Sequence, residues 1–128
     1  MIEHFEEPIR IMEEIHRITI NGAKIYILVP YFRSYYAFND PTHRHFFGVS
    51  SFDYYDPTTI YGRLYRYSDA TFKVISVRLD KRWEGKYLSR LHKWVSIYAN
   101  RSPDRYERLL SHLYPLQELE FILETVKK

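Results

Sequence analysis

Several residue types on which many functional sites depend are scarce or missing in this chain of 128 residues. It contains no cysteine, which excludes disulfides, thiolate metal ligands and cysteine nucleophiles. It contains four glycines, and none of them belongs to a glycine-rich phosphate-binding motif. The chemistry of the protein must therefore come from its histidine, carboxylate, hydroxyl, basic and aromatic side chains.

Long hydrophobic segments are also missing. The longest nearly uncharged run, residues 25–32, is much shorter than the roughly 20 apolar residues of a membrane-spanning helix. The acidic residues 1–7 are the opposite of the basic start of a signal peptide. We therefore expect a single cytoplasmic domain, residues 1–128, with no membrane partner. The small number of asparagine, glutamine and methionine residues favours a thermophilic source.

Positive charge is concentrated in the middle of the chain. The formal net charge is +3, but residues 1–20 hold five acids against two arginines, a balance of −3. Residues 63–93 hold nine lysines and arginines against three acids, a balance of +6. This local excess goes beyond what solubility requires and is typical of surfaces that bind a polyanion.

Aromatic residues are abundant, with 13 tyrosines, eight phenylalanines and two tryptophans. A core of this size does not readily bury them all, so we expect some rings at the surface. Half-buried packing accounts for such tyrosines without a function, because the ring packs while the hydroxyl stays in water. The functional alternatives are a self-association surface and a stacking platform for bases.

Alternating apolar residues predict an α+β fold with an antiparallel sheet of about five strands, built from two hairpins and a central strand. The clearest local signal is Asn21-Gly22, which favours a type I′ turn between the first two strands. An aromatic-rich loop, residues 30–42, precedes the central strand. The expected strands are residues 17–20, 23–29, 43–55, 60–67 and 71–79.

Helical periodicity is found at both ends of the chain. Ser102 and Pro103 form a typical helix start, and Pro115 must break or kink the helix that follows. We expect the N-terminal helix and the two to three C-terminal helices to pack on one face of the sheet. The expected helices are residues 3–16, 85–100, the one that starts at Ser102, and residues 116–126.

A basic stripe on the helix that follows residue 85 is the first candidate site. If that helix begins one turn early, four basic residues lie on one face at steps of four, four and three. The opposite face carries Leu88, Leu91 and Val95, which we expect to be buried. Such a row can follow a phosphate backbone, although the solvated side of an ordinary amphipathic helix looks the same. The expected nucleic-acid-binding residues are Arg78, Arg82, Trp83, Lys86, Arg90 and Lys93.

Two histidines, His43 and His45, are candidate metal ligands, because alternate residues of a strand project to the same face. Tyr87 follows at the start of the expected helix. This arrangement resembles the HUH endonucleases of rolling-circle replication, although Arg44 stands where that family has a bulky apolar residue. The resemblance implies that His43 and His45 hold a divalent metal and that Tyr87 attacks a phosphodiester. The alternative is that both histidines are ordinary strand or loop residues.

Three functions therefore follow from the sequence. The first is a small non-enzymatic protein that contacts DNA or RNA through residues 63–93 and needs no cofactor. The second is a structural or interaction protein that forms a homodimer through the aromatic residues 31–38 or through a sheet face. The third is the metal-dependent nuclease.

Overall fold

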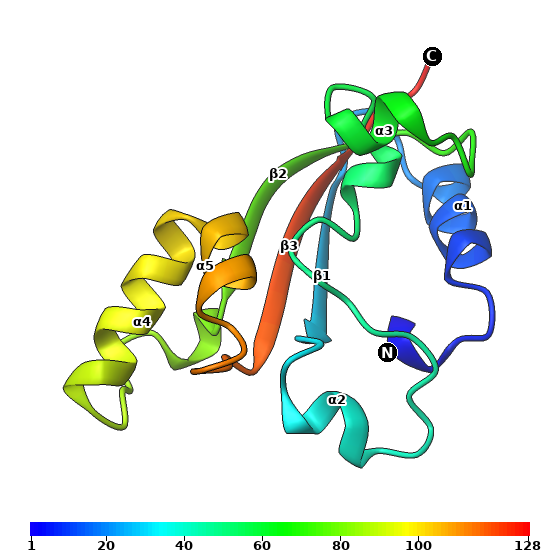
Figure 1. The fold of residues 1–128 in the computed structure, drawn as a ribbon. Helices are drawn as coiled ribbons and strands as arrows, with labels where there is room; N and C mark the ends of the chain where they lie inside the picture. The colour runs from blue at the N-terminus through cyan, green and yellow to red at the C-terminus, as the bar shows by residue number, and fades with distance from the viewer.

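A three-stranded antiparallel sheet forms the centre of the fold in the computed structural model, which describes all 128 residues (Figure 1). The strands are β1 (Lys24–Pro30), β2 (Phe72–Leu79) and β3 (Glu118–Thr125), in the order β1-β3-β2. The last strand of the chain therefore lies between the other two. The α+β class is confirmed, whereas the prediction of about five strands in two hairpins is wrong.

Five α-helices and three single turns of 3-10 helix surround the sheet. Figure 1 shows α4 and α5 beside β2, while α1 and α3 lie at the end of the sheet near the C-terminus. No helix combines the length and apolar character that a bilayer span requires. The helices are α1 (Pro8–Ile18), α2 (Tyr35–Asn39), α3 (Ile60–Leu64), α4 (Arg90–Arg101) and α5 (Pro103–Leu109), and the 3-10 turns are η1 (Ile2–His4), η2 (Asp53–Tyr55) and η3 (Lys81–Trp83).

The segment 116–126 differs most from expectation, because it forms the central strand β3 instead of a final helix. Leu119, Phe121 and Leu123 are fully buried, and the residues between them are only partly buried. Apolar residues in this segment fit both a helical and an alternating pattern, so its own spacing does not separate the two. Pairing with β1 and β2, which come from much earlier in the chain, makes it a strand.

A turn forms at Asn21-Gly22, but it is not of type I′, because only Gly22 and not Asn21 has a positive φ, and it does not join two strands. Residues 17–20 are not a strand, because α1 continues to Ile18, and the turn leads from this helix into β1. Gly22 has a φ of 83°, and its amide donates to the Thr125 carbonyl at 2.8 Å. The turn therefore closes against the C-terminal strand, which takes the place of the expected hairpin partner.

The expected strands 43–55 and 60–67 are also wrong. The first is irregular chain with one isolated bridge and the turn η2, and the second contains α3. Asp56 anchors this region to the sheet by accepting a bond from the Val74 amide at 2.9 Å. A Cβ at Gly62 would lie 1.8 Å from the Asp56 carbonyl oxygen, so only glycine allows α3 this close approach. Tertiary contacts thus replace the second hairpin.

One hydrophobic core of 18 buried residues includes side chains from all three strands. The free edge of β2 is covered by α4, because the Asn100 side chain accepts from the Leu79 amide at 2.7 Å and donates to the Leu79 carbonyl at 2.9 Å. The side chain of Tyr26, on the face of β1 that points away from the core, is 69% exposed, so this face of the sheet remains open to solvent. The helices therefore surround one face and one edge of the sheet.

Candidate functional site

An open pocket of about 400 Å³ lies at the end of the sheet where β1 and β2 end and β3 begins. The residues that line it include Tyr35, Tyr36, Trp83 and Tyr114 together with Lys86. These residues come from α2, η3 and the loops before α4 and β3. We call this site the aromatic pocket.

The tyrosines of α2 are held in place by the N-cap of that helix. Ser34 Oγ accepts a bond from the Tyr36 amide at 3.1 Å and donates to Gln117 Oε1 at 2.7 Å. One hydroxyl therefore starts the helix and ties it to the residue before β3. The rings of Tyr35 and Tyr36 lie 4.3 Å apart at the pocket wall.

Tyr106 fixes the opposite wall. Its hydroxyl donates to the Tyr114 carbonyl at 2.8 Å and accepts from the Leu116 amide at 2.7 Å. The ring is fully buried, and this burial raises the pKa of Tyr106. Because the hydroxyl satisfies both backbone groups, the loop that carries Tyr114 has a defined position at the pocket.

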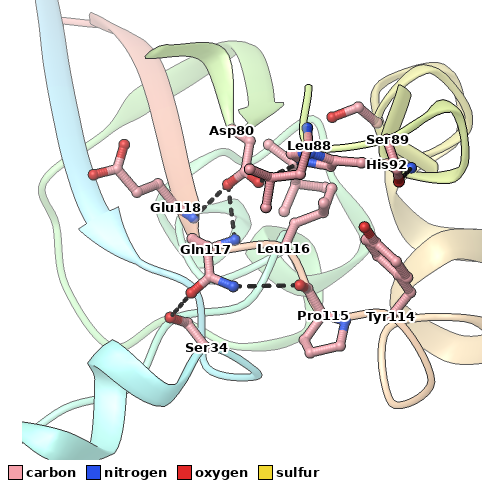
Figure 2. Close-up of polar contacts among 12 residues, drawn as sticks. Ser34, Asp80, Leu88, Ser89, His92, Tyr114, Pro115, Leu116, Gln117 and Glu118 are labelled. Carbon is pink, nitrogen blue, oxygen red and sulfur yellow. Dashed lines mark hydrogen bonds and ion pairs between the residues drawn. The ribbon is translucent and has the colours of Figure 1, made fainter. Parts of the chain in front are cut away.

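Asp80 forms the floor of the aromatic pocket. Its Oδ1 accepts bonds from the amides of Gln117 at 2.7 Å and Glu118 at 2.8 Å, as Figure 2 shows. Asp80 is 4% exposed and has a φ of 51°, a backbone conformation that few residues other than glycine adopt. Burial raises the pKa of Asp80, while the two amide bonds and the nearby His92 oppose this rise.

His92 faces Asp80 from the first turn of α4. The Leu88 amide donates to His92 Nδ1 at 3.1 Å. An amide N–H can only donate, so Nδ1 carries no hydrogen, and the neutral ring has its hydrogen on Nε2. That atom lies 3.9 Å from Asp80 Oδ2. The two side chains therefore form a complementary pair, with a hydrogen of the ring directed to the carboxylate.

The sequence did not single out this pair. Asp80 follows β2 and His92 lies on α4, and no local spacing connects them. The one local sequence signal for the position of His92 was Ser89, a residue type that is typical of helix N-caps. In the structure Ser89 is the N-cap of α4, and its hydroxyl accepts from the His92 amide at 3.1 Å. A serine three residues earlier places His92 in the first turn of a helix, but it does not show what the ring meets.

The expected basic stripe is divided in the structure. The helix begins at Arg90, with Ser89 as its cap, so Arg82 and Lys86 precede it. Arg82 lies in η3 and forms a two-bond ion pair with Glu118. Lys86 lines the aromatic pocket beside Trp83 and has no ion-pair partner. Of the six expected residues, Trp83 and Lys86 are therefore the ones that meet in this pocket.

The three other basic residues, Arg78, Arg90 and Lys93, differ in whether their charge is paired with a carboxylate. Arg78 lies 3.9 Å from a carboxylate oxygen of Glu84 and bonds to Asn100, whereas Arg90 and Lys93 are exposed on α4 without an ion pair. The glutamates of α1 do not neutralise them, because the ion pairs on that helix are local, such as Glu14 with Arg17 at 2.6 Å. Lys86, Arg90 and Lys93 thus remain free cations.

The buried face of α4 is also not the expected one. Val95 is buried, but Leu91 is 60% exposed, and Leu88, which precedes the helix, is 91% exposed. The helix instead buries the short side chains of Ser96 and Ala99. Short side chains permit the close approach in which Asn100 pairs with the edge of β2, and Leu91 consequently faces away.

The two candidate metal ligands do not converge. His45 directs its Nε2 to the Glu6 carbonyl at 3.1 Å, while His43 directs its Nδ1 to the Ala37 carbonyl at 3.1 Å. They lie in irregular chain, so the alternation of a strand does not apply. Tyr87 packs its ring against His92, with centroids 5.5 Å apart. His43, but not His45, lines a second open pocket of about 430 Å³ that also contains Trp83 and Arg82.

A second group of aromatic residues lies in and around α3, which Figure 1 shows at the other end of the sheet. The rings of Tyr54, Tyr61, Tyr65 and Tyr67 contact one another in stacked or tilted pairs, with centroids 5.0 to 5.9 Å apart. The basic segment 63–93 therefore contributes to both ends of β2 instead of forming one continuous patch.

Comparisons with protein-family models, curated proteins and solved structures find no match to this chain. Its function must therefore be argued from the geometry of its own sites.

Proposed function

We propose that this protein binds single-stranded nucleic acid without catalysing a reaction, and that one base enters the aromatic pocket. The observation that carries the proposal is the presence of Trp83, Tyr36 and the unpaired Lys86 on the wall of one pocket. Aromatic faces stack on bases, and a free ammonium group binds phosphate. The pocket thus combines the two contacts that unpaired nucleotides need.

The size of the pocket favours an unpaired strand. A volume of about 400 Å³ is small for a duplex but suits one flat heterocycle and part of its sugar. A base presents both of its faces to protein rings only when it has left a helical stack. Stacking on an aromatic side chain contributes about 1–3 kcal/mol per base and depends little on the base.

The phosphates would follow the free cations. Lys86 is at the pocket, and Arg90 and Lys93 continue along the exposed side of α4. Arg82 contributes less in this proposal, because Glu118 already neutralises its guanidinium group. A strand that leaves the pocket along α4 therefore meets positive charge that has no competing carboxylate.

The experiment is a fluorescence-anisotropy titration with a labelled oligothymidine of roughly 15 nucleotides at several salt concentrations. Trp83→Ala should weaken binding by roughly 5- to 150-fold, which corresponds to the loss of one stacked base. Lys86→Ala should weaken it and lower the slope of log K against log salt concentration by about 0.7.

An exposed ring away from both the pocket and α4 supplies the matched control. Tyr26 is 69% exposed on β1 and does not line the pocket, so Tyr26→Ala should leave the affinity within twofold of the wild type. Absence of binding at low salt, or equal losses in Trp83→Ala and Tyr26→Ala, would contradict the proposal.

A further inference from the structure

Glu3, His4 and His43 bring a carboxylate and two imidazoles together beside the second pocket. Glu3 Oε1 lies 3.6 Å from His4 Nε2 and 3.9 Å from His43 Nε2. The side chains of Glu3 and His43 are each 8% exposed. The Arg44 amide donates to the Glu3 carbonyl at 2.8 Å, which attaches η1 to the loop that carries His43.

The hydrogen bonds of His43 define where its hydrogen lies. Its Nδ1 is 3.1 Å from the Ala37 carbonyl oxygen, which can only accept. Nδ1 must therefore carry the hydrogen, and in the neutral ring Nε2 has a free lone pair. This lone pair faces Glu3 Oε1 and also Asp40 Oδ2, which is 3.6 Å away.

The same reasoning applies to His4 through two linked bonds. Thr42 Oγ1 lies 2.6 Å from Asp40 Oδ1 and 2.8 Å from His4 Nδ1. The Thr42 amide also donates to Asp40 Oδ1 at 2.9 Å, so this oxygen is the acceptor of both bonds from Thr42. Thr42 must give its one hydrogen to Asp40 and accept from His4. The neutral His4 ring therefore also presents a lone pair on Nε2, directed to Glu3.

Two imidazole lone pairs and a carboxylate oxygen thus face one another with no hydrogen between them. For neutral rings such an arrangement is repulsive, and either a proton on Nε2 or a metal ion between the groups removes the repulsion. This is also the arrangement of metal-bound histidines, which donate their other ring N–H to a backbone carbonyl or a similar acceptor. Tetrahedral zinc ligands at their usual distances stand roughly 3.3 Å apart, whereas these three atoms lie within 4.8 Å of one another, so the side chains would have to close around the ion.

We propose that Glu3, His4 and His43 bind one divalent transition-metal ion through Glu3 Oε1 and the Nε2 atoms of both histidines. Two imidazoles and a carboxylate match zinc best among the common divalent ions. The other oxygen of Glu3 is bonded to the Met1 amino group at 2.6 Å, which leaves Oε1 for the metal. A fourth position remains on the side of Asp40, whose Oδ2 can accept a bond from a bound water or serve as a ligand itself.

This site is independent of the proposed nucleic-acid binding and uses only one of the two histidines that the sequence indicated. His45 is excluded, because its Nε2 already bonds to the Glu6 carbonyl. Glu3 and His4 were not candidates, since nothing in their local sequence relates them to His43.

The test is isothermal titration of metal-free protein with Zn²⁺, together with Co²⁺ titration followed by visible absorption. We expect one ion per chain and a Co²⁺ spectrum typical of tetrahedral nitrogen and oxygen ligands. His43→Ala and Glu3→Gln should each lower the affinity by about 100-fold or more, since losing an outer hydrogen-bond partner alone costs roughly 10- to 100-fold. Circular dichroism of each variant establishes that it is folded.

His45→Ala is the matched control, because it removes a histidine two residues away whose ring does not face the cluster. It should bind Zn²⁺ within twofold of the wild type. If His43→Ala does not fold, His4→Ala carries the test, since the His4 side chain is 40% exposed and its loss is tolerated more easily. Absence of one-to-one binding, or a loss in His45→Ala equal to that in the ligand variants, would show that the histidines only form ion pairs with Glu3.

Discussion

The two histidine–carboxylate clusters at this end of the sheet contain the same residue types and have opposite hydrogen positions. At Asp80 and His92, the ring nitrogen Nδ1 accepts from an amide, so the hydrogen on Nε2 points to the carboxylate. At Glu3, His4 and His43, both Nδ1 atoms donate, so lone pairs point to the carboxylate. In the first cluster a ring hydrogen lies on the side of the carboxylate, whereas in the second the neutral rings leave no hydrogen between their Nε2 atoms and Glu3 Oε1.

The difference in hydrogen position arises from the backbone group that contacts Nδ1 of each ring. His92 meets the Leu88 amide, which can only donate, and His43 meets the Ala37 carbonyl, which can only accept. The backbone group at Nδ1 thus determines whether Nε2 of the neutral ring presents a hydrogen to the carboxylate or a lone pair, as the proposed metal site requires. The presence of histidine and carboxylate together does not distinguish the two.

The largest effect is expected when the closed cluster is broken at Asp80. Asp80→Ala leaves the buried amides of Gln117 and Glu118 without their acceptor, so we expect a loss of about 3 kcal/mol in the free energy of unfolding. Urea denaturation followed by tryptophan fluorescence measures it. Asp69→Ala is the control, because this side chain is 99% exposed and its loss should change stability by less than about 0.5 kcal/mol. Equal stability of the two variants would mean that Asp80 does not hold β2 to β3.

A smaller effect is expected for His92. His92→Ala removes a buried ring and the acceptor of the Leu88 amide, so the free energy of unfolding should fall by about 1–2 kcal/mol, with Zn²⁺ affinity unchanged. Long-range ¹H–¹⁵N spectra of the metal-free wild type, at a pH where the rings are neutral, measure which nitrogen of each ring carries the hydrogen. His92 should show its hydrogen on Nε2, and His4 and His43 should show theirs on Nδ1. The same tautomer in all three rings would contradict the assigned difference in hydrogen position between His92 and the two histidines beside Glu3.

The smallest effect concerns the charge of Asp80, which faces His92 and Glu118. Asp80→Asn keeps the acceptor for the two amides. Because burial raises the pKa of Asp80, the folded protein holds this proton more tightly than the unfolded chain. The resulting stabilisation is present below the unfolded pKa, near 3.8, and is lost as pH rises through the folded pKa. Denaturation at pH 3 and pH 7 should therefore show a larger deficit of the variant at pH 3, and a constant difference would contradict the raised pKa.

Part of the fold could be predicted because its signals are local. The apolar spacing of the first helix, the alternation of β1 and β2, and the Ser102-Pro103 helix start each act within a few residues. The central strand could not be predicted in this way. Its leucines fit two periods, and the choice depended on partners far away in the sequence.

The candidate sites follow the same division. Trp83 and Lys86 could be named as candidates, because charge and aromatic content are properties of a segment, and both line the aromatic pocket. The sequence indicated His43 as a metal ligand together with His45, whereas the metal site that we propose joins His43 to Glu3 and His4. Its contacts in space, Glu3 and His4, lie almost 40 residues earlier, and only the packing of η1 on the loop brings them together.

The residue types available for chemistry, the absence of cysteine sites, the charge of the middle segment and the locally encoded helices and strands can all be derived from the amino-acid sequence. Only the folded chain shows which strand is central, which cations stay unpaired and which atom of each histidine carries a hydrogen. The physical reason is that pairing, burial and hydrogen-bond direction depend on the neighbour in space, and each of these neighbours comes from a different part of the chain.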